Sequence, residues 1–153
     1  MCREAPHSVV SRATDMNNLQ AKRKAITETI VSQNARGLKS EAGLDELFFV
    51  IKKRNILAAC IQETWRSGFE DIEYSGRRLI AVGLDAANQS RRGSQGVGIA
   101  LSKRDTDAWK AAGSVIHKEF GARVIAVRLV VRDSQQRAVG LFLVSALCTC
   151  WKC

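Results

Sequence analysis

The sequence predicts an α/β fold, and two observations lead to that expectation. Two short apolar runs, Ile30–Val31 and Ile56–Ile61, flank about twenty residues in which apolar side chains recur at helical spacing. Each run is followed by a polar residue, Asn34 in the first case and Glu63 in the second. This pattern is typical of a strand–helix–strand unit in which both strands end at the same edge of one sheet.

The elements of this unit follow from local signals. We expect a first strand over 30–36, released into a turn at Gly37. Residues 41–54 have the i, i+3, i+4, i+7 spacing of a helix with one apolar face, and Ser40 is a suitable N-cap. The apolar positions of this helix are Leu44, Leu47, Phe48 and Ile51. A second strand is expected over 56–62.

The rest of the chain predicts mostly strands. Short strands are expected at 71–74 and 79–84, a polar loop at 85–95, a buried strand at 96–101, a helix or loop at 103–112, and strands at 115–120, 123–132 and 138–146. The last two of these are joined by a hairpin turn at 133–136. We therefore expect a mixed sheet with at least one crossover helix, followed by a β-rich portion.

Length, net charge and cysteine content indicate which kinds of protein this chain resembles in composition. A length of 153 residues allows one domain at most. The net charge of +9 and the pI near 9.8 indicate a polyanionic partner, with nucleic acid as the first candidate. No apolar run approaches the roughly 20 residues that span a bilayer, and the N-terminus has no apolar signal region. Five cysteines without a signal sequence favour a reduced, intracellular compartment.

The two ends of the chain differ from the middle. Residues 1–28 form a basic leader without apolar periodicity, which we expect to be disordered. Within it, Lys22-Arg23-Lys24 is either a solvated charge run, which we favour, or a phosphate contact or nuclear localisation signal. Residues 147–153 are an aberrant Cys-rich tail. Its three cysteines fall short of the four ligands of a structural zinc site.

Asn34 and Glu63 are the candidate site residues. Mg²⁺ prefers oxygen ligands, usually one or two carboxylates with water and a substrate phosphate. Glu63 offers a carboxylate, and Asn34 offers a neutral oxygen and an amide donor. The alternatives are a turn residue at Asn34 and a solvated residue at Glu63, and composition alone favours these. Trp65 and Arg66, in the loop after Glu63, are candidates for nucleic-acid contact, and core packing is the alternative for Trp65.

Four motifs in order resemble the endonuclease/exonuclease/phosphatase superfamily. They are Ser-Gln-Asn-Ala-Arg-Gly-Leu at 32–38, Ile-Leu-Ala-Ala-Cys-Ile-Gln-Glu-Thr at 56–64, Tyr-Ser-Gly at 74–76 and Gly-Val-Gly-Ile-Ala-Leu-Ser at 96–102. They are most similar to the endonuclease domains of non-LTR retrotransposons and to craniofacial-development-protein-2-like sequences. The resemblance covers residues 29–146 and implies a partial domain, the N-terminal portion of a four-layer α/β sandwich.

The resemblance implies Mg²⁺-dependent hydrolysis of DNA phosphodiester bonds in intact relatives. It assigns Glu63 to the metal and Asn34 to the positioning of metal and phosphate. Arg91 and Arg92 of the polar loop are candidate phosphate contacts, with an ordinary exposed turn as the equal alternative, and Arg36 is a further candidate.

The same resemblance shows what the chain does not carry. Leu147 stands where the superfamily has a tyrosine, and the superfamily's later Asp, Asn and His residues have no counterpart. We therefore expect little or no catalysis by this chain. The alternatives are a non-enzymatic basic protein that binds nucleic acid and an unstable retroelement-derived fragment.

Overall fold

The computed structural model describes residues 28–85, 87, 96–133 and 135–147, which form two β-sheets and two α-helices. In chain order the elements are β1 (Thr29–Asn34), α1 (Glu41–Lys53), β2 (Ile56–Gln62), β3 (Phe69–Tyr74), β4 (Arg77–Val82), β5 (Val97–Leu101), α2 (Lys103–Ala111), β6 (Ile116–His117), β7 (Val124–Arg132) and β8 (Ala138–Ala146). One sheet has the strand order β1-β2-β5-β4-β3, and the other has the order β6-β7-β8. The described chain is therefore α/β with strands predominating.

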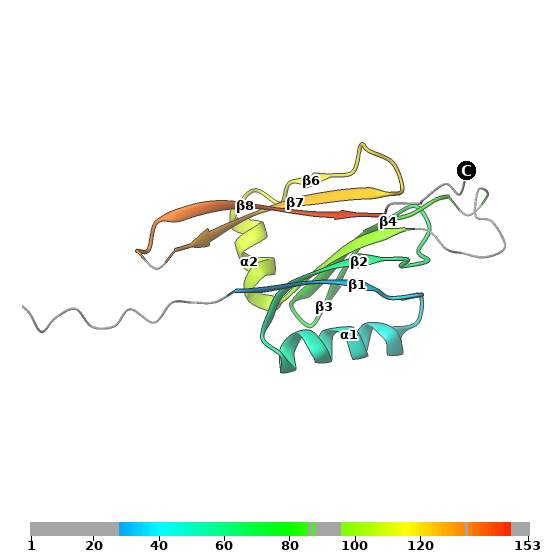
Figure 1. Cartoon of the computed structure of the whole chain (residues 1–153), viewed down its shortest axis with the longest axis horizontal. Helices are drawn as coiled ribbons and strands as arrows, with labels where there is room; N and C mark the ends of the chain where they lie inside the picture. Colours follow the sequence, from blue (N-terminus) through cyan, green and yellow to red (C-terminus); the bar gives the residue numbers. More distant parts are fainter. Residues whose placement is uncertain (1–27, 86, 88–95, 134, 148–153) are drawn as a thin grey trace, which may run out of the picture.

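The predicted strand–helix–strand unit is confirmed. β1 and β2 pair in parallel, with Asn34 opposite Gln62, and α1 connects them along one face of the sheet (Figure 1). The helix begins after Ser40, whose hydroxyl accepts the N–H of Gly43 at 3.1 Å. Its buried side chains are Leu44, Leu47, Phe48 and Ile51, the four positions that the spacing predicts. The helix ends before Asn55, which has a φ of +50° and starts the turn into β2.

The five-stranded sheet is mixed. β2 pairs antiparallel with β5, β5 with β4, and β4 with β3. β5 is buried along its whole length, as expected for the glycine-containing strand. A Cβ at Gly98 would lie 3.2 Å from the carbonyl oxygen of Ile80, so glycine allows the close approach of β4 to β5.

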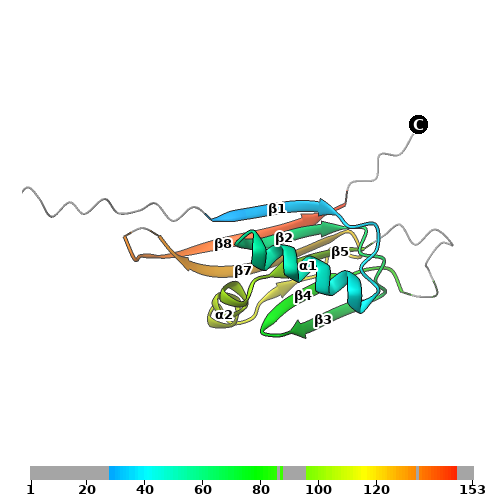
Figure 2. The same cartoon turned by 90° about the horizontal axis from the view of Figure 1, so that it is seen from below.

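The molecule has layers on both faces of this sheet. α1 covers one face, and the three-stranded sheet with α2 covers the other (Figures 1 and 2). The first core gathers the α1 residues against Ile61, Leu79 and Ala100, and the second packs Trp109 of α2 with β4, β5, β7 and Leu143 of β8. Two separate apolar cores therefore hold the sheet from both sides.

β3 and β4 each begin two residues before the expected strands over 71–74 and 79–84, and β4 ends at Val82. The largest difference from the prediction comes before β7. The strand expected over 115–120 is only Ile116–His117. Ser114 has a φ of +56°, and the chain leaves the sheet after His117 so that the Nζ of Lys118 lies 3.7 Å from the ring centroid of Phe69. The cation–π contact outside the sheet replaces the strand pairing that alternation predicts. The segment over 103–112 is a helix.

Two expectations fall largely outside the described residues. Of the basic leader, 1–28, the structure describes only Glu28, and of the Cys-rich tail, 147–153, it describes only Leu147. Within the part of the chain that is described, neither α1 nor α2 has the length and apolar character required to cross a membrane.

Candidate metal and phosphate site

β1, β2 and β4 all finish at the same end of the five-stranded sheet, which is the edge formed by the carboxyl ends of these strands. β1 is parallel to β2, and both β2 and β4 run antiparallel to β5. Beyond the strands, the N–H of Ala35 donates to the carbonyl of Gln62 at 3.0 Å, and the N–H of Gly37 donates to that of Glu63 at 2.9 Å. Asn34 and Glu63 therefore lie at the same edge, on neighbouring strands.

Asn34 also has a local role in the turn after β1. Its Oδ1 accepts the N–H of Arg36 at 3.1 Å, the geometry of an Asx turn. Both side chains are exposed, and Arg36 has a φ of +47°. A carboxamide oxygen has two lone pairs, so this turn leaves one of them, and the amide hydrogens, for another ligand. The turn role and a site role are thus compatible in Asn34.

Glu63 is a half-buried residue in an unusual backbone conformation. Its φ is +54°, and that of Trp65 is +57°, whereas non-glycine residues rarely enter this left-handed region because it costs about 1–2 kcal/mol. Between them Thr64 is fully buried, and its N–H donates to the carbonyl of Gly96 at 3.2 Å. Such strain persists where neighbouring structure enforces it, and it is concentrated at functional sites.

Two glycines allow the backbone path around Glu63. Gly37 and Gly96 have φ values of +118° and +106°. A Cβ at Gly37 would lie 2.7 Å from the ring of Trp65, and a Cβ at Gly96 would lie 2.6 Å from the Oγ1 of Thr64. The two glycine backbones therefore lie against the side chains of Trp65 and Thr64, the residues that follow Glu63.

Arg66 is part of the core and does not face a ligand. Its side chain is 9% exposed, its Nη2 donates to the carbonyl oxygen of Leu38 at 2.6 Å, and its Nη1 pairs with Glu70. The guanidinium is therefore engaged within the protein and is not placed for the nucleic-acid contact that the sequence suggested. The sequence held no signal for this contact, because the accepting carbonyl lies 28 residues earlier in the chain.

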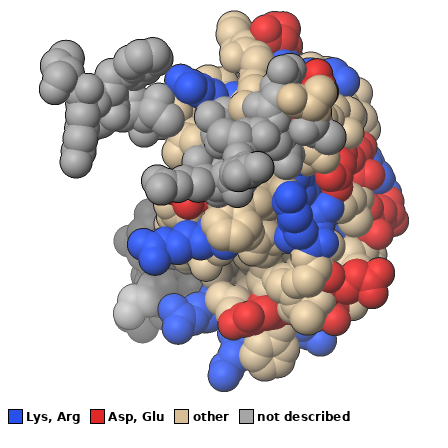
Figure 3. Space-filling view, turned by 90° about the vertical axis from the view of Figure 1, so that its right-hand side faces the viewer, with Lys and Arg blue, Asp and Glu red and all other residues tan. Residues whose placement is uncertain are grey.

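Arg91 and Arg92 lie outside the described residues. In the sequence they stand between β4, which ends at the same end of the sheet as β1 and β2, and β5. Figure 3 looks toward this end of the molecule, where Lys and Arg side chains are interspersed with Asp and Glu side chains. Arg36 is the described member of the predicted phosphate-binding set.

A cavity of about 650 Å³ opens at the same end of the molecule, next to the end of β4. Its lining includes Phe69, Leu84, Asp85, Lys118 and Glu119. These residues come from three segments far apart in the sequence, and none belongs to a motif. Sequence reasoning missed this cavity because it depends on the segment after His117 turning toward Phe69.

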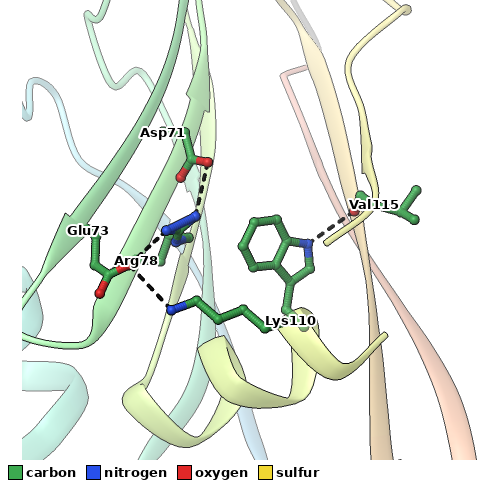
Figure 4. Close-up of polar contacts among 6 residues, drawn as sticks. Asp71, Glu73, Arg78, Lys110 and Val115 are labelled. Atoms are coloured by element: carbon green, nitrogen blue, oxygen red, sulfur yellow. Dashed lines mark hydrogen bonds and ion pairs between the residues drawn. The ribbon is translucent and has the colours of Figure 1, made fainter. Parts of the chain in front are cut away.

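Carboxylates elsewhere are engaged with cations. Asp71 and Glu73 of β3 both contact Arg78, at 3.1 and 2.8 Å, and Glu73 also lies 3.4 Å from the Nζ of Lys110 (Figure 4). These contacts lower the pKa of Glu73, first through the hydrogen bond from Arg78. Asp71 and Glu73 are therefore already neutralised by protein cations.

The residues at this end of the sheet offer few ligands for a metal ion. Within the described residues no group of three or more His, Cys, Asp or Glu side chains is placed to hold a metal ion. Mg²⁺, however, is commonly bound through one or two carboxylates, with water and phosphate completing the octahedron. Glu63 and Asn34 offer one carboxylate and one amide oxygen, which is fewer ligands than a closed protein cage requires.

Comparison with models of known protein families and with curated proteins gives no match for this chain.

Proposed function

We propose that the edge around Asn34 and Glu63 binds Mg²⁺ and a DNA phosphate, as one half of a phosphodiesterase site. The observation that carries this proposal is the parallel pairing of β1 with β2, extended by the 2.9 Å hydrogen bond from Gly37 to Glu63. It places Asn34 and Glu63 at the carboxyl ends of neighbouring strands, where open α/β sheets bind ligands. The left-handed backbone at Glu63 supports the same assignment.

Each residue has a distinct role in this proposal. Glu63 holds the metal through its carboxylate, and Asn34 orients the phosphate through its amide hydrogens. Arg36, with Arg91 and Arg92, adds positive charge toward the DNA backbone. When bound, Mg²⁺ supplies Lewis-acid polarisation of the phosphate.

We expect binding with little or no turnover. Hydrolysis needs a group to activate water, and the histidine of the described residues, His117, lies in the other sheet with its Nδ1 3.3 Å from Glu119. Leu147, at the superfamily's tyrosine position, packs against the second apolar core and has no hydroxyl. A single carboxylate and an amide without a base favour ligand binding over catalysis.

The proposal includes the larger architecture. The order α1, five-stranded sheet, three-stranded sheet is compatible with three layers of the superfamily's four-layer sandwich. A fourth layer would lie on the outer face of β7 and β8, where Phe142 and Val144 are 59% and 55% exposed.

The test is binding of duplex DNA, measured by fluorescence anisotropy with and without Mg²⁺, alongside nicking of supercoiled plasmid. Glu63→Gln removes the charge and retains the shape of the side chain. Asp107→Asn is the matched control, because it removes one carboxylate at an exposed position of α2, away from the proposed site. We expect Mg²⁺ to tighten DNA binding by wild type and Asp107→Asn and to have no effect on Glu63→Gln. Plasmid nicking should be absent in all three.

Two results would contradict the proposal in different ways. Nicking that disappears in Glu63→Gln would mean that the site is catalytically complete. Equal response to Mg²⁺ in wild type and Glu63→Gln would remove Glu63 from the metal site.

The second candidate function is nucleic-acid binding without metal, which the net charge of +9 favours. It predicts affinity that falls steeply with salt, ignores Mg²⁺ and survives Glu63→Gln. Loss of affinity in a variant with Arg36, Arg91 and Arg92 changed to serine would identify these residues as the contacts. The fragment alternative predicts no cooperative unfolding transition in urea, whereas two packed cores predict one.

A further inference from the structure

The described residues leave four sheet edges, and three of them carry features that discourage pairing with another strand. β6 has two residues, and β3 carries three acidic side chains. β1 has a register irregularity after Thr29 and is mostly polar. Short length, charge and irregularity are the usual means by which proteins protect an edge.

The β8 edge has none of these features. Its nine residues, Ala-Val-Gly-Leu-Phe-Leu-Val-Ser-Ala, include no charge and no proline. Its pairing with β7 continues without interruption from Ala138 to Ala146. A nine-residue edge strand without charge is unusual in a chain of net charge +9. Its unpaired backbone groups are available to pair with another strand.

The outward backbone groups of β8 can be assigned. The N–H of Leu147 donates to the carbonyl of Arg123 at 2.9 Å, in line with the β7–β8 register. Because successive residues of an antiparallel strand direct these groups to opposite sides, the odd-numbered residues of β8 bond to β7. The N–H and C=O groups that face the free edge belong to Ala138, Gly140, Phe142, Val144 and Ala146.

The outward backbone groups of these five residues can pair with those of an identical, antiparallel strand. Phe142 is the central residue of β8, so an antiparallel copy centred there places Phe142 opposite its own equivalent and Gly140 opposite Val144. All five residues then form reciprocal backbone pairs. The ring of Phe142 already lies 5.9 Å from the guanidinium carbon of Arg128 and 6.5 Å from the ring of His117, so its orientation is supported from β7 and β6.

We propose that two copies of this chain associate through antiparallel pairing of their β8 strands, with the two-fold axis at Phe142. The two three-stranded sheets then form one continuous six-stranded sheet, and the exposed Phe142 and Val144 side chains gain cross-strand neighbours. This inference is independent of the proposed metal and phosphate site.

The absence of charge on β8 and its length of nine residues favour a second copy of the chain as the partner of its free edge. Nucleic acid is disfavoured because β8 offers no cation. In residues 1–27, no stretch without a charged residue is as long as β8, and the longest, residues 5–11, contains Pro6. The uncharged strand that matches β8 is β8 itself.

The test is sedimentation of the full chain under reducing conditions, across about 5 to 200 µM, a range that resolves micromolar dimers. Phe142→Lys places two ammonium groups at the two-fold axis. Phe49→Lys is the matched control, since Phe49 is 62% exposed on α1 in the opposite layer. We expect wild type and Phe49→Lys to dimerise equally, and Phe142→Lys to raise the dimer Kd at least about tenfold. Val144→Lys should weaken the dimer similarly, and circular dichroism confirms that each variant is folded.

Amide hydrogen exchange adds a readout of the register. In the dimer, the amides of Gly140, Phe142 and Val144 should gain protection as concentration rises, whereas those of Leu141 and Leu143 should not change. A wild-type monomer throughout the range would overturn the proposal, as would equal weakening by Phe49→Lys. Protection of the outward amides in a monomer would also overturn it, because a segment of the same chain would then cover the edge.

Discussion

The main-chain N–H of Gly37 donates to the main-chain carbonyl of Glu63 across 2.9 Å, which ties the turn after β1 to the residue after β2. This bond extends the parallel pairing of the two strands past their ends, into the region where ligands approach. It holds Glu63 in its left-handed conformation, together with the buried Thr64–Gly96 bond beside it. The geometry of the candidate site is thus fixed by backbone contacts.

Gly96→Ala should destabilise the fold at this point. A Cβ there would lie 2.6 Å from the Oγ1 of buried Thr64, at a φ of +106°. We expect the free energy of unfolding to fall by about 3 kcal/mol, as strain and overpacking add. Gly121→Ala is the control, because its φ is +80° but its Cβ would meet nothing within 4 Å, so only about 1 kcal/mol should be lost. Urea unfolding measures both, and equal losses would mean that the contact with Thr64 is unimportant.

Arg66→Met should be costly because it removes a buried donor. The substitution leaves the Leu38 carbonyl and the Glu70 carboxylate without their guanidinium. A loss of about 2–4 kcal/mol in the free energy of unfolding is expected. Arg36→Met, at an exposed position, should change stability by less than about 0.5 kcal/mol. If the two variants were equally stable, Arg66 would not be the anchor of the loop that follows Glu63.

The pH dependence of stability should contain a contribution from Asp105. Burial raises the pKa of this carboxyl above its ordinary value of 3.8, although Ser102 and Arg104 act in the opposite direction. The folded state therefore binds the proton more tightly than the unfolded state. Stability from this group is present below pH 3.8 and decreases as pH rises from there through the raised folded pKa.

Comparison with Asp105→Asn isolates this contribution from other carboxyls, such as Asp133, whose pKa is lowered by hydrogen bonds from Arg137. Unfolding in urea at a series of pH values should give a difference, wild type minus variant, that falls with pH over that window. Parallel curves for the two proteins would show that the Asp105 pKa is the same in both states.

Local signals were sufficient to predict α1 and its neighbours. Ser40 supplies the cap, and the apolar spacing selects the four buried side chains that the structure shows. The second strand was predicted at the observed residues, because a continuous apolar run between a helix end and a polar residue has few alternatives. The parallel order of the two strands then placed Asn34 and Glu63 at one edge.

Other features depend on contacts between distant segments. The core role of Arg66 requires the carbonyl of Leu38, and the short β6 results from the contact of Lys118 with Phe69. Neither contact produces a periodic pattern of residue types in the sequence. The left-handed backbone of Glu63 could not be predicted either, because it depends on contacts of its loop with Gly37, after β1, and Gly96, before β5.

The most direct test of the central claim is paramagnetic broadening by Mn²⁺, used as a probe of the Mg²⁺ site in the folded chain. We expect low Mn²⁺ to broaden the amide resonances of Asn34, Gly37, Glu63 and Gly96 first, and excess Mg²⁺ to reverse the effect. The broadening should vanish in Glu63→Gln and persist in Asp107→Asn. Broadening centred on Asp71 and Glu73, or unchanged in Glu63→Gln, would contradict a metal site at the ends of β1 and β2.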